Sequence, residues 1–339
     1  MLIDEPIFIH AWWRSGSTYL WAKLRESESY RCYFEPLNPS IAELKLTTVK
    51  RLPDSDDTQN LRHPTLKTHY FAEYADLLGS ATLGYSRDLA YDRYLLLPDQ
   101  SDERLQNYLS RLISSASEVE RRPILCFCRS QMRIAWMKKI FGGKHIAQIR
   151  NPADQWASFK SYQLEVRPNF SVDMIIIALK LRRLYPNAFA HIEEFEYFAQ
   201  QVSKRASLPI DVITQHFIPQ FVRQRNCLDV FLVIWIASAL QALSYCNLVL
   251  DIDQLSNKRD RRNIAEQWFA AIGVRIDFSD CSSPTAIRTN PAFERAAEDA
   301  VNAIRSNAAS LVVSEPDVVR KWWPELSTLS RQILELATS

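Results

Sequence analysis

Glycine is scarce in this chain, with six among 339 residues against a usual share of ~7 %. Each glycine is therefore expected where the backbone needs its conformational freedom. Gly16 is one of them, and it lies in a short polar segment directly after an apolar run.

An excess of charge of one sign is also missing, because 41 lysines and arginines face 39 acidic residues and the net charge is +2. Proteins that bind nucleic acids usually carry a stronger basic excess or a concentrated basic stripe. One short basic run, residues 258–262, is interpreted as the solvated start of a helix. We therefore expect no nucleic-acid partner.

The six cysteines have no metal-site spacing and form no CxxC pair, since Cys126 and Cys128 are two positions apart. The chain opens without the charged and apolar regions of a secretory signal. Reduced thiols and a cytoplasmic location are the corresponding expectation.

A clear membrane-spanning run is missing as well. The most apolar segment, residues 229–251, contains Gln241, Ser244 and Asn247, and its pattern changes near Ser244. A helix followed by a buried strand explains this segment better than one membrane span, so no transmembrane segment is expected.

The sequence does contain alternating apolar strands and amphipathic helices. Strands are predicted at 6–12, 123–128, 144–150 and within 246–253, and helices at 17–28, 129–141 and from Pro152 onward. This alternation is typical of α/β proteins with a central parallel sheet flanked by helices. No internal repeat or low-complexity linker is found, so we expect a single domain over 1–339, with residues 38–120 as a helical and loop-rich insertion.

A short polar segment, residues 14–18, joins the first predicted strand to the first helix and has the sequence RSGST. In such a connection, loop N–H groups and the helix N-terminus converge on one point, where they hold an anion. Arg14 adds a fixed charge, and the hydroxyl groups of Ser15, Ser17 and Thr18 add donors. The segment lacks the GK[ST] ending with which phosphate-binding loops hold a nucleoside triphosphate and Mg²⁺.

A second candidate anion site follows the strand at 144–150. Arg150 ends this strand, and Ser158 comes eight residues later, two turns into the next helix. Parallel strands have their carboxyl ends at one edge of the sheet, where ligands of α/β proteins bind. Arg150 and Ser158 are therefore predicted to hold a second phosphate.

Together, the two segments resemble the sulfotransferases that use 3′-phosphoadenosine 5′-phosphosulfate (PAPS). In that family, a loop similar to WRSGSTY binds the 5′-phosphosulfate, and a strand ending in Arg, with Ser eight positions later, binds the 3′-phosphate. The resemblance is good over 6–36 and 122–163 and looser over 244–282, and the C-terminal RKG-type motif of cytosolic members is absent. It implies a single P-loop-like α/β domain, with PAPS as co-substrate and adenosine 3′,5′-bisphosphate as product. The implied binding residues are Arg14, Ser15, Gly16, Ser17, Thr18, Tyr19, Arg150 and Ser158.

The resemblance also implies a metal-free sulfuryl transfer to a hydroxyl group, with Arg14 at the bridging oxygen of the leaving phosphate. Two residues compete for the role of general base. Glu35 lies in YFEPL, which is similar to a segment of carbohydrate sulfotransferases, and its apolar neighbours favour a carboxylate that accepts a proton near neutral pH. His69 lies in LKTHY, which is similar to the catalytic KTH segment of cytosolic members. We rank Glu35 first, because Lys67 lies much farther from Arg150 in sequence than in those enzymes.

The Glu35 context favours a carbohydrate or a small hydroxyl-bearing metabolite as acceptor, bound by residues 38–120. Two other functions stay open. A P-loop nucleotide kinase requires a GxxxxGK[ST] lysine and a Mg²⁺-binding carboxylate at a strand end, and neither is evident. A non-catalytic nucleotide-binding protein of the same fold would have an incomplete site. Whether the chain forms homo-oligomers is also left open.

Overall fold

The computed structural model describes residues 5–51, 66–78, 83–91, 93–165, 170–182, 185–192, 224–283 and 291–312, together with 195, 197, 199 and 200. Its contacts divide the chain into two compact units, one formed by 1–150 with 245–284 and the other by 151–244 with 285–339. The single domain expected from the sequence stays a prediction.

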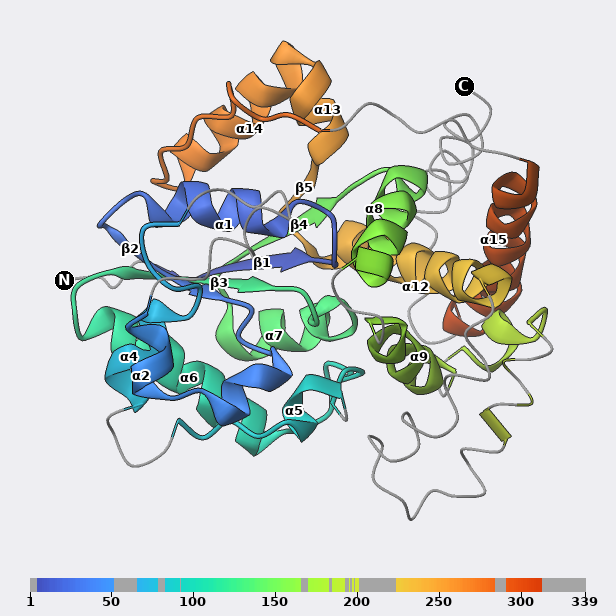
Figure 1. Ribbon diagram of the computed structural model, residues 1–339, viewed down its shortest axis with the longest axis horizontal. Coiled ribbons are helices and arrows are strands. Elements are labelled where there is room, and N and C mark those ends of the chain that lie inside the picture. The colour runs from blue at the N-terminus through green and yellow to red at the C-terminus, as the bar shows by residue number, and fades with distance from the viewer. Residues whose placement is uncertain are drawn as a thin grey trace. The chain divides into compact units, whose positions relative to one another are not determined.

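The first unit contains a five-stranded parallel sheet with the strand order β2-β3-β1-β4-β5 (Figure 1). Ile9 in the central strand pairs in register with Cys126 on one side and with Ile146 on the other. The α/β class with a central parallel sheet is therefore confirmed. The strands are β1 (Ile7–Ala11), β2 (Tyr30–Phe34), β3 (Arg122–Phe127), β4 (Lys144–Ile149) and β5 (Leu248–Asp251).

The sequence patterns do not predict the edge strand β2, nor the helix α13 (Ile252–Asn257), whose first residues fall in the strand expected within 246–253. The strand β2 is five residues long and carries Arg31 between Tyr30 and Cys32. The sheet accepts this charge because the Arg31 guanidinium donates to the backbone carbonyls of Glu73 and Ser115.

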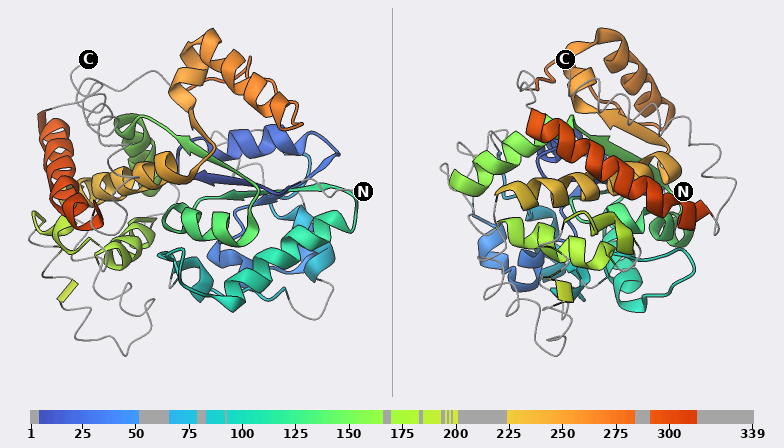
Figure 2. Two further views of the ribbon diagram at one scale, coloured as in Figure 1. Left: turned by 180° about the vertical axis from the view of Figure 1, so that it is seen from behind. Right: turned by 90° about the vertical axis from the view of Figure 1, so that its right-hand side faces the viewer.

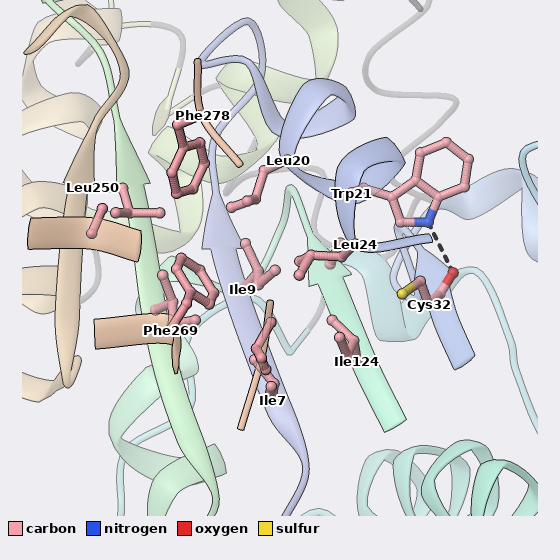
Figure 3. Packing of buried hydrophobic residues seen from close by; sticks show 14 of the residues in the cluster. Ile7, Ile9, Leu20, Trp21, Leu24, Cys32, Ile124, Leu250, Phe269 and Phe278 are labelled. Carbon is pink, nitrogen blue, oxygen red and sulfur yellow. Dashed lines mark hydrogen bonds between the residues drawn. The ribbon is translucent and has the colours of Figure 1, made fainter. Parts of the chain in front are cut away.

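Helices cover both faces of the sheet, as the left view of Figure 2 shows from behind. One face packs against α1 (Ser17–Arg25), α13 (Ile252–Asn257) and α14 (Arg259–Ala271), and the other against α6 (Glu103–Ser117) and α7 (Ile134–Phe141). Leu20 and Leu24 of α1 lie over Ile9 and Ile124 in the sheet (Figure 3). Full burial of a leucine such as Leu20 stabilises the fold by about 1.5–3 kcal/mol.

The described parts of 38–120 are helical and rich in loops, as expected. Asp102 caps α6 by accepting a hydrogen bond from the Leu105 N–H at 3.0 Å. Leu105, Leu109 and Leu112 are fully buried on one face of that helix. That residues 38–120 bind the acceptor stays a prediction. The shorter helices are η1 (Pro39–Glu43), α2 (Leu46–Val49), η2 (Ala72–Tyr74), α4 (Ala75–Leu78) and α5 (Asp88–Tyr91).

The second unit is helical in its described residues. Trp156 and Phe159 of α8 pack against Phe231 of α12, with Trp156 5.5 Å from Phe159 and 5.2 Å from Phe231 between ring centroids. Its helices are α8 (Pro152–Glu165), α9 (Phe170–Leu181), η4 (Pro186–Phe189), α12 (Gln224–Tyr245) and α15 (Pro291–Val312).

Among the described residues, the Cys227–Tyr245 part of α12 is long and apolar enough to cross a membrane by length and composition alone. Of that stretch, 67 % is buried inside the protein, as in the core helix of a soluble protein. The prediction of a helix followed by a strand within 229–251 is confirmed, although only Leu250 is fully buried in β5. The cytoplasmic location stays a prediction.

Candidate functional site

The carboxyl ends of the five parallel strands bring most of the predicted residues to one edge of the sheet. Glu35 follows β2, Arg129 follows β3, the loop 12–16 follows β1, and Arg150 follows β4. The chain leaves β1 towards β2 on one side and leaves β4 towards β5 on the other. The switch point of the sheet therefore lies between β1 and β4, and such points bind ligands in open α/β sheets.

The loop after β1 forms a tight turn. The N–H and the hydroxyl of Ser15 both donate to the Trp12 carbonyl, at 3.2 Å and 2.7 Å. Arg14 has a φ of 64° and Gly16 a φ of 88°. The positive φ requires glycine here, and a Cβ atom on Gly16 would also lie 2.9 Å from Nε2 of Gln148, which would have to shift.

Backbone strain is concentrated at this edge. Among the described non-glycine residues, positive φ values occur at Arg14, Glu35 and Glu120. A left-handed conformation costs about 1–2 kcal/mol in such a residue. Two of the three are predicted site residues, and strain of this kind clusters at functional sites.

The N-terminus of α1 faces the loop without a side-chain cap. Its N-cap is Gly16, and its first turn contains no acidic residue. The first N–H groups of a helix have no intrahelical partner, so this end keeps a positive partial charge. Ser17 is half-buried there and accepts a hydrogen bond from the Cys128 thiol at 3.3 Å, while Thr18 is buried.

Arg150 lies against the loop from the β4 side. Its Nη1 donates to the Arg14 carbonyl at 3.2 Å. Its Nε is 3.7 Å from the Asp253 carboxylate, yet it is buried with no hydrogen-bond partner among the described residues. Gln148, which sequence reasoning missed, donates to the Ser15 carbonyl at 2.7 Å. The available signal was a polar residue inside an apolar strand, two positions before Arg150.

Ser158 belongs to α8 in the second unit, so its pairing with Arg150 stays a prediction. The start of α8 agrees with the sequence pattern, because Oδ1 of Asn151 accepts a hydrogen bond from the Ala153 N–H at 2.8 Å.

The carboxylate of Glu35 is held by polar groups. Its Oε2 accepts hydrogen bonds from Nη1 of Arg129 at 2.7 Å and from Nδ2 of Asn38 at 2.9 Å. The Arg129 side chain is 5 % exposed, and its guanidinium lies over the rings of Trp13 and Tyr91, 5.1 Å and 5.7 Å from their centroids. The prediction of an apolar setting for Glu35 is therefore wrong, because the buried Arg129, which follows the neighbouring strand β3, contacts the carboxylate.

His69 lies at the far end of α1 from the loop. Its Nδ1 accepts a hydrogen bond from the Phe71 N–H, and its carbonyl accepts one from Arg25, the last residue of α1. Ser17 and Arg25 are eight positions apart on α1, which corresponds to a helical rise of about 12 Å. Burial, and then the charge of Arg25, lower the pKa of His69. This placement favours Glu35 as the base.

The Tyr19 side chain is held by a segment distant in sequence. Its hydroxyl donates to Oδ1 of Asp280 at 2.8 Å, and Asp280 forms an ion pair with Lys23 at 2.7 Å. Burial, followed by the hydrogen bond to Asp280, raises the pKa of the Tyr19 phenol. A contact of Tyr19 with a nucleotide stays a prediction.

A chain of buried hydrogen bonds runs beside the site. Ser130 Oγ lies 2.7 Å from Nδ1 of His10, Nε2 of His10 lies 2.9 Å from Nδ1 of His145, and Nε2 of His145 lies 2.9 Å from the Gly142 carbonyl. A carbonyl only accepts, so His145 donates to it from Nε2. Burial lowers the pKa of both imidazoles and keeps them neutral near pH 7, so Nδ1 of His145 accepts from Nε2 of His10, and Nδ1 of His10 accepts from the Ser130 hydroxyl.

We expect acid to destabilise the fold through these imidazoles. Burial lowers the pKa of His145 to about 4 and that of His10 well below 6.5. As the pH falls from about 6.5 to about 4, the unfolded chain binds protons that the folded chain excludes, so the free energy of unfolding decreases. For His145 the decrease reaches about 3 kcal/mol. In urea unfolding, His145→Phe should show a shallower pH dependence than the wild type, and equal slopes would contradict this account.

No family model, curated protein or solved structure matches the chain. Among the described residues, no group of three histidine, cysteine, aspartate or glutamate side chains is placed to hold a metal ion.

Proposed function

We propose that this protein is a PAPS-dependent sulfotransferase with a P-loop-like anion site, acting on a hydroxyl of a carbohydrate or small metabolite. One observation carries the proposal. The two segments that resemble the family's phosphate-binding motifs flank the switch point of the sheet, and Arg150 of the second donates to the Arg14 carbonyl of the first at 3.2 Å. Arg14 and Arg150, which are 136 positions apart in sequence, are thus in contact at the carboxyl edge of the sheet.

The residues at this edge fit a nucleotide with two anionic groups. The uncapped N-terminus of α1, with Gly16 and Ser17, offers N–H and hydroxyl donors to the 5′ group. Arg150 brings a second buried guanidinium to this edge, and its Nε, 3.7 Å from the Asp253 carboxylate, has no hydrogen-bond partner in the described chain. Arg14 supplies a charge that titration does not remove near neutral pH.

When bound, PAPS supplies the sulfuryl group and leaves as adenosine 3′,5′-bisphosphate. Glu35 takes the proton from the acceptor hydroxyl as the new S–O bond forms. Arg129 and Asn38 both donate to Oε2, so we assign the proton transfer to Oε1. Arg14 stabilises the negative charge that develops on the phosphate oxygen as the old S–O bond breaks.

The two alternative functions, a P-loop kinase and a non-catalytic nucleotide-binding protein, require other residues at the carboxyl edge of the sheet. A P-loop kinase requires a lysine in the loop, whereas Gly16 is followed by Ser17. A non-catalytic nucleotide-binding protein has no need for backbone strain at a carboxylate residue, yet Glu35 has a φ of 40°. Both observations favour the transferase.

Thermal unfolding with different nucleotides separates these three functions. Adenosine 3′,5′-bisphosphate at about 100 times its Kd should stabilise the protein by about 2.7 kcal/mol, which raises Tm by roughly 5 °C. ATP with Mg²⁺ at equal concentration should give a smaller shift, and stabilisation by ATP with Mg²⁺ alone would disprove the proposal. Transfer of labelled sulfate from PAPS to a panel of glycans and hydroxyl metabolites then distinguishes an enzyme from a binding protein and identifies the acceptor.

A further inference from the structure

Two side chains near the carboxyl end of β4 hold consecutive carbonyl groups of the loop. Gln148 lies in β4, and Arg150 directly follows the last residue of that strand, Ile149. Gln148 Nε2 donates to the Ser15 carbonyl at 2.7 Å, and Arg150 Nη1 donates to the Arg14 carbonyl at 3.2 Å. The loop rests directly on Gln148, since a Cβ atom on Gly16 would lie 2.9 Å from its Nε2.

These contacts set the direction of the loop N–H groups. In a trans peptide the C=O and the N–H point in opposite directions, and the described chain contains no cis peptide bond. With the Ser15 carbonyl on Gln148, the Gly16 N–H of the same peptide points away from that side chain. The neighbouring Ser15 N–H is already used by the Trp12 carbonyl at 3.2 Å. The Gly16 N–H is thus directed outward beside the uncapped start of α1.

We propose that Gln148 is a positioning residue that orients the loop for the 5′ anionic group of the nucleotide. This inference rests on the proposed function and goes beyond it, because no sequence motif includes Gln148. Arg150 serves the loop and is also expected to hold the 3′-phosphate. The hydrogen bond from Gln148 to the Ser15 carbonyl involves neither phosphate. It therefore holds the loop in the same conformation when Arg150 binds the 3′-phosphate.

The burial of Gln148 supports this role over a purely structural one. The residue is 3 % exposed, and its Oε1 has no hydrogen-bond partner among the described residues. An unpaired buried acceptor destabilises a fold, and an apolar side chain of similar size would avoid this penalty. A buried amide that lowers stability through its unpaired oxygen, yet hydrogen-bonds to the loop, is typical of a residue with a functional role.

The test compares wild type with Gln148→Met in the full chain, using calorimetry with three ligands. We expect adenosine 3′,5′-bisphosphate and adenosine 5′-phosphate to bind about tenfold more weakly, because one ordering hydrogen bond is lost. Adenosine 3′-phosphate should bind equally well. Tm should change little, because the variant removes the unpaired Oε1 but leaves the Ser15 carbonyl without its donor. Gln148→Glu has nearly the same size but places an acceptor against the Ser15 carbonyl, so it should also weaken binding of the two nucleotides that carry a 5′-phosphate. It replaces Gln148→Met in the test if the methionine variant does not fold.

The outcomes separate this inference from the proposed function. Equal binding of adenosine 5′-phosphate by the wild type and a folded variant would overturn the positioning role. If the variant had a lower Tm and bound both adenosine monophosphates more weakly to the same degree, Gln148 would have only a structural role. A wild-type protein that binds none of the three ligands would instead contradict the proposed function.

Discussion

Replacing Glu35 with glutamine is expected to lower kcat for sulfate transfer by about 10²–10⁴-fold, the usual contribution of a general base. The Kd for adenosine 3′,5′-bisphosphate should change little, because Glu35 follows β2 whereas the loop and Arg150 follow β1 and β4. Single-turnover transfer and calorimetry measure the two quantities separately. Arg129 loses its counter-ion at 2.7 Å, so we also expect the free energy of unfolding to fall by about 1–3 kcal/mol.

The matched control is Glu73→Gln. Glu73 is another largely buried carboxylate paired with an arginine, since it lies 2.6 Å from Arg25 at the far end of α1. This variant should lose stability while kcat of the folded fraction is unchanged. Wild-type turnover in Glu35→Gln, together with an inactive His69→Ala, would assign the base to His69 instead.

Replacing Arg150 with alanine is expected to weaken the binding of adenosine 3′,5′-bisphosphate by about 100-fold, because truncating a buried charge partner costs about 2–5 kcal/mol. The variant removes the predicted ligand of the 3′-phosphate and the donor to the Arg14 carbonyl. Wild type should therefore prefer the bisphosphate to adenosine 5′-phosphate, and Arg150→Ala should largely lose that preference. Calorimetry with both nucleotides measures this ratio.

Arg122 provides the control for this second prediction. It is buried like Arg150 and donates to the backbone carbonyls of Glu5 and Ile272, but it begins β3 and so lies at the amino edge of the sheet. Arg122→Ala should lower Tm and leave nucleotide affinity unchanged. If Arg150→Ala bound the bisphosphate as tightly as wild type does, the assignment of the second phosphate site would be wrong.

The elements with strong local signals could be predicted from the sequence. The run 123–128 is continuously apolar and forms β3, and Asp102 with the leucines that follow defines α6. β2 has no such signal, because Arg31 interrupts its five residues and finds its partners, two carbonyl groups and the Asp76 carboxylate, at positions distant in sequence. The predicted helix at 129–141 begins instead as a 3-10 turn, η3 (Gln131–Arg133), in which buried Arg133 donates to the carbonyls of Leu89 and Ala90.

Prediction of the candidate site was limited in the same way. The loop and Arg150 could be found because each follows a strand with a clear local pattern. The Arg129 contact with Glu35 joins residues 94 positions apart, and the Gln148 contact with Ser15 joins residues 133 apart. No local pattern in a single sequence predicts either of these contacts.

The sequence by itself determined the α/β class, the scarce glycine at position 16 and the positions of Arg14 and Arg150 at the ends of apolar runs. These are local properties, set by side-chain periodicity and backbone freedom. The order of the strands was decided only by tertiary structure, because it depends on which buried faces pack together. That order brings the loop and Arg150 to one switch point, pairs Glu35 with a buried arginine, and leaves His69 at the other end of α1.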